Sequence, residues 1–330
     1  MNNSRFSILR VFFPGLFLLT FLMCGIASGS AFNYKMMSGA SPPMKWKTVV
    51  GWNGRHVVAD GETLLDIARN FELGWNELEI LYPDMDPWVP DPGTEIEIPE
   101  CWILPSGESE GIVVNIPELR LYRYLPGTQM VETYPVGIGT EEYQTPLGEY
   151  RVVDRKENPV WNVPPSLREK YSFDYLPPCP ENPLGEYWLG LSAEHIGIHG
   201  TNFPWAVGRQ VSRGCIRLYP EHIKRLFPAV TVGTGVRIIY EPVKVGVMDG
   251  EIYMEVHPDT DGKKTDMEKY ATERLQELGN ECYVSRDIVI KALTEKNGVP
   301  VRIGIIQGGG DEEALHADHN IENILNEAIN

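Results

Sequence analysis

The chain has 330 residues and a formal net charge of −17, with 29 lysines and arginines against 46 aspartates and glutamates. Hydrophobic residues make up 42% of it, which is enough material for packed cores and excludes a largely disordered protein. The length favours two or three domains. The negative charge would repel a phosphate backbone and argues against nucleic acid as a partner.

The N-terminal segment has the pattern of an export signal. Arg5 and Arg10 precede an apolar run from 11 to 27, and small residues follow it up to Ala31. Because the run is short for a membrane span, we expect residues 1–31 to be a cleaved signal peptide, with an uncleaved anchor as the alternative. Lipid attachment at Cys24 is disfavoured, because a large methionine precedes it.

Residues 54–100 show a compact βααβ order. A strand at 56–58 precedes a helix that Thr63 can cap, a second helix begins near Asn76, and a strand closes the segment at 95–99. This order resembles a lysin motif (LysM), most clearly in DGETLLDIARNF and GTEIEIP. The resemblance implies binding to the N-acetylglucosamine-containing backbone of peptidoglycan or chitin. The middle departs from the family pattern at Tyr82-Pro83-Asp84, and a βααβ spacer without a ligand is the alternative.

Two further regions follow. Short strands and Gly/Pro turns dominate residues 110–241, with one clear helix at 221–227, which predicts an antiparallel β-rich domain rather than βαβ units. Residues 242–330 read as an α+β region: a hairpin around Asp249-Gly250, helices near 265–278 and 286–296, and a strand at 301–306. No pattern in this last region indicates a function.

The most specific chemistry lies in two segments, His195–Thr201 and Ser212–Leu218. A cysteine attacks as its thiolate, and a free thiol with a pKa of about 8.5 is mostly protonated at neutral pH. A nearby histidine can take the proton of Cys215, while Arg213 and Arg217 favour the resulting anion.

Glycines in the same segments leave the backbone accessible. Gly200 and Gly214 have no side chain to block an approaching substrate, and the N–H groups of Gly214 and Cys215 are suitable donors to a tetrahedral oxyanion. Each feature alone is weak, but together they indicate acyl transfer through a thioester.

Three other roles for Cys215 remain open. The first is a buried structural thiol, although a glycine and two arginines are poor core neighbours. The second is a disulfide with one of the remaining cysteines, Cys101, Cys179 or Cys282. The third is zinc binding with His195 and His199, whose spacing suits zinc on a helix; the Gly/Ile alternation between them argues against a helix, and no fourth ligand is evident.

The two segments together resemble the signature of the L,D-transpeptidase (YkuD-type) family: HGT, ten residues, then SRGCIRL. PVGIGTEEYQTPLGEY at 135–150 is similar to the family's strand–TPxG segment. Residues 158–171 and 181–191 resemble the exported, ErfK-like subgroup that acts on Gram-negative cell walls. The resemblance covers about 130 residues and implies a mainly β catalytic domain of β-sandwich type, located in the periplasm or cell envelope of a bacterium.

The resemblance also implies roles for individual residues. It makes Cys215 the nucleophile and His199 the proton acceptor and donor, and it gives no role to His195. Arg213 stands where many members have histidine. The remaining expectations are oxyanion binding or orientation by Gly214, Arg217, Ser212 and Arg213, and a substrate cleft with Gly200, Thr201, Trp161 and Tyr171.

By the same resemblance, the substrate is a peptidoglycan stem peptide, cleaved between meso-diaminopimelate and D-alanine without a metal or cofactor. Attack on the thioester by a second diaminopimelate gives a 3→3 cross-link, a protein lysine gives wall-attached protein, and water gives a trimmed tripeptide. A hydrolase on the same scaffold and a non-catalytic wall-binding protein are the alternatives. If Cys215 is a free thiol, a Cys101–Cys179 bridge is available to fix the covering segment.

Overall fold

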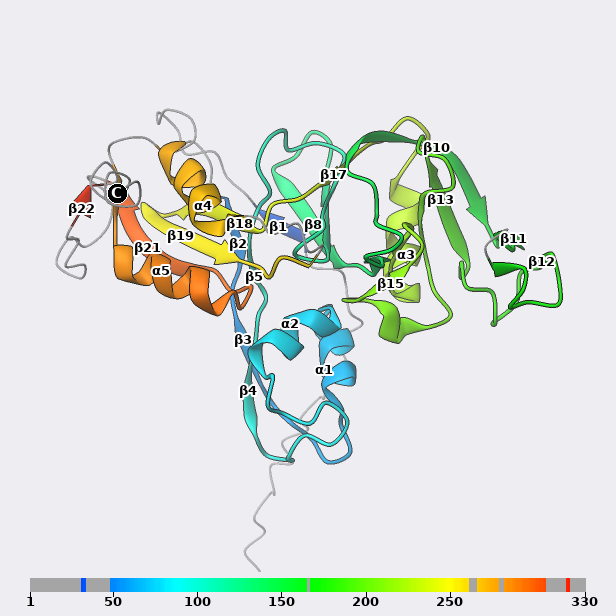
Figure 1. Cartoon of the computed structure of the whole chain (residues 1–330), viewed down its shortest axis with the longest axis horizontal. Coiled ribbons are helices and arrows are strands. Elements are labelled where there is room, and N and C mark those ends of the chain that lie inside the picture. Colours follow the sequence, from blue (N-terminus) through cyan, green and yellow to red (C-terminus); the bar gives the residue numbers. More distant parts are fainter. Residues whose placement is uncertain are drawn as a thin grey trace, which may run out of the picture.

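The computed structural model describes residues 31–33, 48–164, 167–260, 266–278, 282–306 and 319–320. The expected signal peptide lies outside these residues except for Ala31. Among the described residues, no helix is both long enough and apolar enough to cross a bilayer. Figure 1 shows a green β-rich part on the right, a yellow-to-orange α+β part on the left, and a blue-to-cyan unit below and between them.

A nine-stranded sheet is the framework of the β-rich part. Its spatial order is β1 (Ala31–Asn33), β8 (Met130–Pro135), β7 (Arg120–Tyr124), β6 (Ile112–Asn115), β17 (Gly235–Ile239), β10 (Gly148–Glu157), β13 (Tyr187–Leu191), β14 (Gly197–His199) and β16 (Ile216–Arg217). Shorter elements complete it: β9 (Ile138–Gly139), β11 (Trp161–Asn162), β12 (Tyr175–Leu176), η2 (Pro204–Ala206), β15 (Gln210–Ser212) and α3 (Pro220–Ala229).

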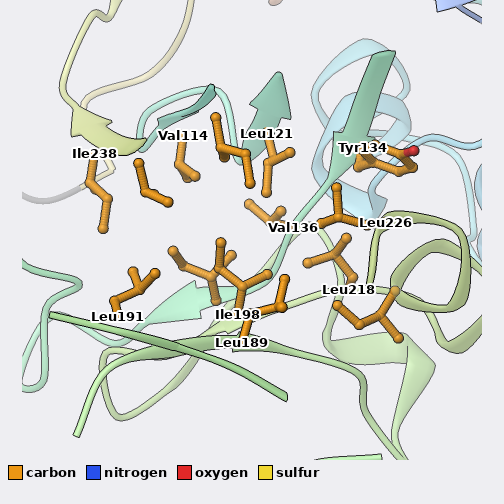
Figure 2. Packing of buried hydrophobic residues seen from close by; sticks show 14 of the residues in the cluster. Val114, Leu121, Tyr134, Val136, Leu189, Leu191, Ile198, Leu218, Leu226 and Ile238 are labelled. Carbon is orange, nitrogen blue, oxygen red and sulfur yellow. The ribbon is translucent and has the colours of Figure 1, made fainter. Parts of the chain in front are cut away.

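The sheet curls over itself, so the core is enclosed by one continuous sheet where two packed sheets were expected. The first residues of β10 pair with β17, and the later ones pair with β13 after a register shift between Val152 and Asp154. Such a bulge bends a strand and increases its twist. The two halves therefore face each other across one cluster, in which Val114 and Leu121 from one half meet Leu189 and Ile198 from the other (Figure 2).

The βααβ unit consists of β3 (Gly54–Val57), α1 (Leu64–Asn70), α2 (Trp75–Leu81) and β4 (Glu95–Ile98), with β3 and β4 antiparallel. Thr63 begins α1 in a capping box: its hydroxyl accepts from the Asp66 N–H, and the Asp66 carboxylate accepts from the Thr63 N–H. The helices bury their apolar faces on the outer side of β6, β7 and β8, where Val113, Tyr122 and Val131 join the unit's cluster.

Ion pairs fix this unit to the nine-stranded sheet and to α3. Arg69 holds Glu221 through two bonds of 2.7 and 2.9 Å, and Glu72 accepts from Arg225 at 2.6 Å. The most buried pair joins α2 to β7: Arg120 is fully buried and donates to both carboxylate oxygens of Glu77 at 2.7 Å.

Removing Glu77 is expected to be strongly destabilising. The Glu77→Ala variant leaves the buried Arg120 guanidinium without its counter-ion, which costs about 3–5 kcal/mol when one partner of a buried pair is lost. Urea unfolding followed by circular dichroism measures the change in unfolding free energy. Glu79→Ala, on the exposed side of the same helix, is the matched control, and equal midpoints for the two variants would contradict the expected importance of the pair.

The C-terminal part is a second sheet covered by two helices. The strand order is β18 (Val243–Met248), β19 (Glu251–Val256), β21 (Val301–Ile306), β20 (Cys282–Val284) and β22 (His319–Asn320). The helices are α4 (Met267–Gln276) and α5 (Arg286–Glu295), and both contribute to one apolar cluster. A ladder of β2 (Val49–Gly51) with β5 (Cys101–Ile103) packs against the opposite side of β18 and β19.

A buried ionic network joins this part to the nine-stranded sheet. Lys244 Nζ lies 2.9 Å from Glu118 and 2.8 Å from Glu255, and His257 Nε2 lies 2.6 Å from Glu255. Burial alone would raise the pKa of Glu255, but Lys244 and His257 hold it below its usual value. Glu118, Glu255 and His257 bring potential metal-ligand atoms within 4.8 Å of one another. Because Lys244 already contacts both carboxylates, the network is best explained as structural.

The Cys101–Cys179 bridge that the sequence leaves available is not formed. Cys179 is a free thiol, so it forms no bridge to Cys101. Cys101 begins β5 beside the C-terminal part, whereas Cys179 follows β12 at the far end of the β-rich part, and these two strands are widely separated in Figure 1. Disulfide bonds require Cα atoms within about 7 Å, which this arrangement does not provide.

Candidate active site

The reactive side chains lie on one face of the sheet. Successive side chains of a strand point to opposite faces. Ile198 of β14 and Ile216 are paired neighbours whose side chains are buried in the central cluster. His199 at the end of β14, Arg217 at the end of β16 and Cys215 immediately before β16 therefore project from the opposite face. The fold thus brings the two predicted catalytic segments together.

Cys215 is a half-buried free thiol immediately before β16. Its Sγ donates to the carbonyl of His195 at 3.4 Å. Burial raises the pKa of the Cys215 thiol, whereas a backbone hydrogen bond from Gly197 and the positive charge of Arg217 lower it, with burial the largest effect. The resting cysteine is therefore a thiol at neutral pH and not a preformed thiolate.

His199 is buried at the end of β14 and is held by the backbone. Its Nδ1 lies 2.5 Å from the carbonyl oxygen of Gly200. Because a carbonyl can only accept, Nδ1 carries the hydrogen and the lone pair remains on Nε2. Burial, assisted by the nearby charge of Arg217, lowers the pKa of His199 to about 3. The imidazole is consequently neutral and able to accept a proton.

Ser212 shapes the turn that presents the nucleophile. Its hydroxyl donates to the carbonyl of Cys215 at 2.6 Å and accepts from the N–H of Gly214 at 3.2 Å. Gly214 has φ +99°, and a Cβ there would lie 2.8 Å from Ile196, so only glycine fits. The Gly214 N–H is expected to bind an oxyanion, but it donates to the Ser212 hydroxyl in this structure. That hydrogen bond must break before the N–H can bind an oxyanion.

Two residues predicted to line the substrate cleft make structural contacts in the folded chain. Gly200 is buried, and a Cβ there would lie 3.1 Å from Ile223 of α3, so the glycine allows α3 to pack closely rather than opening a path to substrate. Thr201 is also buried, and its hydroxyl accepts from the Phe203 N–H at 3.0 Å, which fixes the turn after β14. Their assignment to the substrate cleft stays a prediction.

Arg217 is the cation that acts on the thiol, and aromatic residues lie around the arginines. Arg217 lies close enough for its charge to affect the pKa values of both His199 and Cys215. Burial lowers the pKa of Arg217, and the Tyr171 phenol acts in the opposite direction. The rings of Trp161 and Tyr171 pack edge to face, with their centroids 5.1 Å apart. Arg213 is exposed, with its guanidinium 4.2 Å from the centroid of the Tyr143 ring.

Three contributions were not foreseen from the sequence. The His195 side chain is 90% exposed, but its backbone, at φ +62°, offers the carbonyl that accepts from Cys215. Gly197 supplies a backbone hydrogen bond to the same thiol. Trp188 of β13 stacks on His199, with ring centroids 5.6 Å apart and planes 27° apart. Local sequence gives no signal for these contacts, which depend on strand register.

Alkylation of Cys215 should show the protonation state of the resting site. Because the thiol pKa is raised and His199 stays neutral above about pH 3, the thiolate fraction should grow about tenfold per pH unit between pH 6 and 8. Iodoacetamide labelling, with Cys215 and Cys179 separated by peptide mass spectrometry, measures the rate. A plateau at Cys215 below pH 7 would instead reveal a thiolate–imidazolium pair.

Comparison with known proteins places the chain in a family. Residues 109–245 match the YkuD family, described as the L,D-transpeptidase catalytic domain. In Escherichia coli K12, the protein named probable L,D-transpeptidase YcfS is 34% identical over 302 residues, covering 86% of this chain and 94% of the relative. YbiS, named likewise, is 33% identical over 305 residues, covering 87% and 97%. ErfK/SrfK is 34% identical over 277 residues, covering 79% and 89%. With such identity over most of both chains, this chain belongs to the L,D-transpeptidase family.

Proposed function

We propose that this protein is a cysteine-dependent L,D-transpeptidase that acts on peptidoglycan stem peptides. Family membership supports the reaction class. The observation that carries the assignment of residues is the pairing of β14 with β16, which places His199 at the end of one strand and Cys215 immediately before the other. The imidazole is neutral, and its Nδ1 is bonded to Gly200. This geometry suits a thiol nucleophile with a general base.

In the first half-reaction, His199 Nε2 accepts the proton of Cys215 as the sulfur attacks the carbonyl of meso-diaminopimelate. The negative charge that develops on the carbonyl oxygen is stabilised by backbone N–H groups of the nucleophile turn. His199, now an imidazolium, gives its proton to the departing D-alanine amine. The product is a thioester between Cys215 and the tripeptide stem.

In the second half-reaction, an amine attacks the thioester and His199 takes its proton. The C–S bond breaks, and Cys215 leaves and recovers its proton from His199. A diaminopimelate side chain as acceptor gives a 3→3 cross-link, and a lysine of another protein gives a wall-attached protein. Water as acceptor would make the enzyme a carboxypeptidase. The positive charges of Arg217 and the exposed Arg213 suit carboxylates on the stem peptides.

We propose further that the βααβ unit is a LysM domain and that the mature protein works in the periplasm. The capping box of α1, the antiparallel β3–β4 pair and the two segments that resemble the motif support a glycan-binding role. The N-terminal charge and hydropathy pattern supports export.

Product analysis tests the reaction. The purified 32–330 protein is incubated with disaccharide tetrapeptides, and the products are identified by mass spectrometry beside a heat-denatured sample. A dimer lighter by one D-alanine than two monomers is expected and identifies 3→3 transpeptidation. Tripeptide alone would favour hydrolysis or a protein acceptor, and a lysine-bearing peptide added as acceptor separates these two. Unchanged tetrapeptide in both samples would contradict the proposal.

A further inference from the structure

Trp188 occupies a space that two strands leave open for it. Gly190 of β13 and Gly197 of β14 are paired directly across the ladder. A Cβ on Gly197 would lie 2.5 to 2.8 Å from three carbons of the indole, and a Cβ on Gly190 would lie 2.9 Å from its Nε1. Any larger residue at either position would displace the ring. The indole therefore packs directly on the backbone of the glycine pair.

The indole contacts both components of the nucleophile system. Trp188 is the register partner of His199 on the neighbouring strand, and its ring stacks on the imidazole. The same ring lies on the backbone of Gly197, which hydrogen-bonds to Cys215. One half-buried side chain thus contacts the plane of the base and the backbone beside the sulfur.

We propose that Trp188 is a positioning residue: its indole sets the orientation of His199, keeps water from one face of the imidazole, and fixes the Gly197 backbone against Cys215. Its relevance to catalysis rests on the proposed transpeptidase function. Its effect on the imidazole is a property of the folded protein and can be measured without turnover.

The electrostatic consequence follows from the groups that face His199. Arg217 of β16 is the nearby cation, and Cys215 is neutral in the resting state. Trp188 on β13 carries no charge, and the contacts from Leu184 and Gly200 come from the backbone. Burial is the largest cause of the low pKa of His199. Removing the indole lets water reach the ring, so the imidazole pKa should rise toward its ordinary value of about 6.5.

Titration by NMR of full-length protein labelled at histidine Cε1 tests this directly, with the His199 signal identified by its loss in His199→Gln. We expect the pKa of His199 to be lowest in the wild type, higher in Trp188→Phe, and at least about one unit above wild type in Trp188→Leu. Gly197→Ala, which displaces the indole without altering it, should also raise the pKa. Trp205→Leu, a half-buried tryptophan packed against the βααβ cluster, should leave it unchanged.

An unchanged His199 pKa in Trp188→Leu overturns the proposal. If the leucine variant does not fold, Trp188→Phe decides alone: a raised pKa supports the role and an unchanged one overturns it. With a muropeptide substrate, a Trp188→Leu variant whose His199 pKa reaches about 6.5 should lose about tenfold more kcat at pH 5.5 than at pH 8, because an imidazolium cannot accept the thiol proton. An equal loss at both pH values, together with an unchanged His199 pKa, would indicate a purely structural effect. Inactive wild type would count against the transpeptidase function alone, since the NMR result stands independently.

Discussion

The Cys215→Ala variant is expected to give no cross-linked dimer, no protein adduct and no tripeptide from a tetrapeptide substrate. All three products arise from the same thioester, which an alanine cannot form. Loss of a covalent nucleophile lowers turnover by at least about 10⁴-fold in enzymes that act through an acyl intermediate. The products are measured by mass spectrometry. Far- and near-ultraviolet circular dichroism checks that the variant keeps the wild-type fold.

The matched control is Cys179→Ala. Cys179 is also a half-buried free thiol, but it lies in the segment after β12. The Cys179→Ala variant should retain full activity. Like the wild type, it should accumulate a thioester adduct that hydroxylamine releases. Products that persist in Cys215→Ala at the wild-type rate would show that another group performs the attack, and the assignment of Cys215 would be wrong.

The His199→Ala variant should lose about 10²–10⁴-fold in kcat, the usual contribution of a general base. Without the imidazole, the thiol proton must leave to solvent. Because burial raises the thiol pKa, the residual rate should climb with pH throughout the alkaline range. Steady-state kinetics from pH 6 to 9.5 measure both effects, with KM changing less than kcat.

His195→Ala provides the comparison within the same segment. The His195 side chain is exposed and its contribution to Cys215 comes from the backbone carbonyl, so its removal should change kcat by less than about threefold. A large loss in His195→Ala with little loss in His199→Ala would exchange the two roles and reopen the question of which histidine is the base.

Local sequence was informative where neighbouring residues decide the structure. The strand at 301–306 and the hairpin around Asp249-Gly250 form as expected, because alternation and turn residues act over short distances. The curl of the catalytic sheet was not foreseen, because it depends on which partners β10 finds far away in the chain. The unit over 54–100 has the expected βααβ order, but its extensive burial against β6 to β8 has no local signature.

The same distinction holds within the site. Cys215 and His199 can be predicted from sequence because their chemistry is rare and their spacing is specific. The packing of Gly200 against α3 cannot, because a glycine that opens a path to substrate and one that admits a helix look alike in sequence. Trp188 was overlooked because its stacking on His199 exists only through the pairing of β13 with β14.

The rigid attachment of the βααβ unit has a consequence for how the enzyme would scan its substrate. A domain on a flexible tether raises the effective concentration of a reactive group over a broad volume. Here Arg69, Glu77 and their partners bind the unit to the catalytic body without a linker. A glycan strand held by such a unit would present to the thiol only those stems that lie at one fixed offset and rotational phase along the sugar chain.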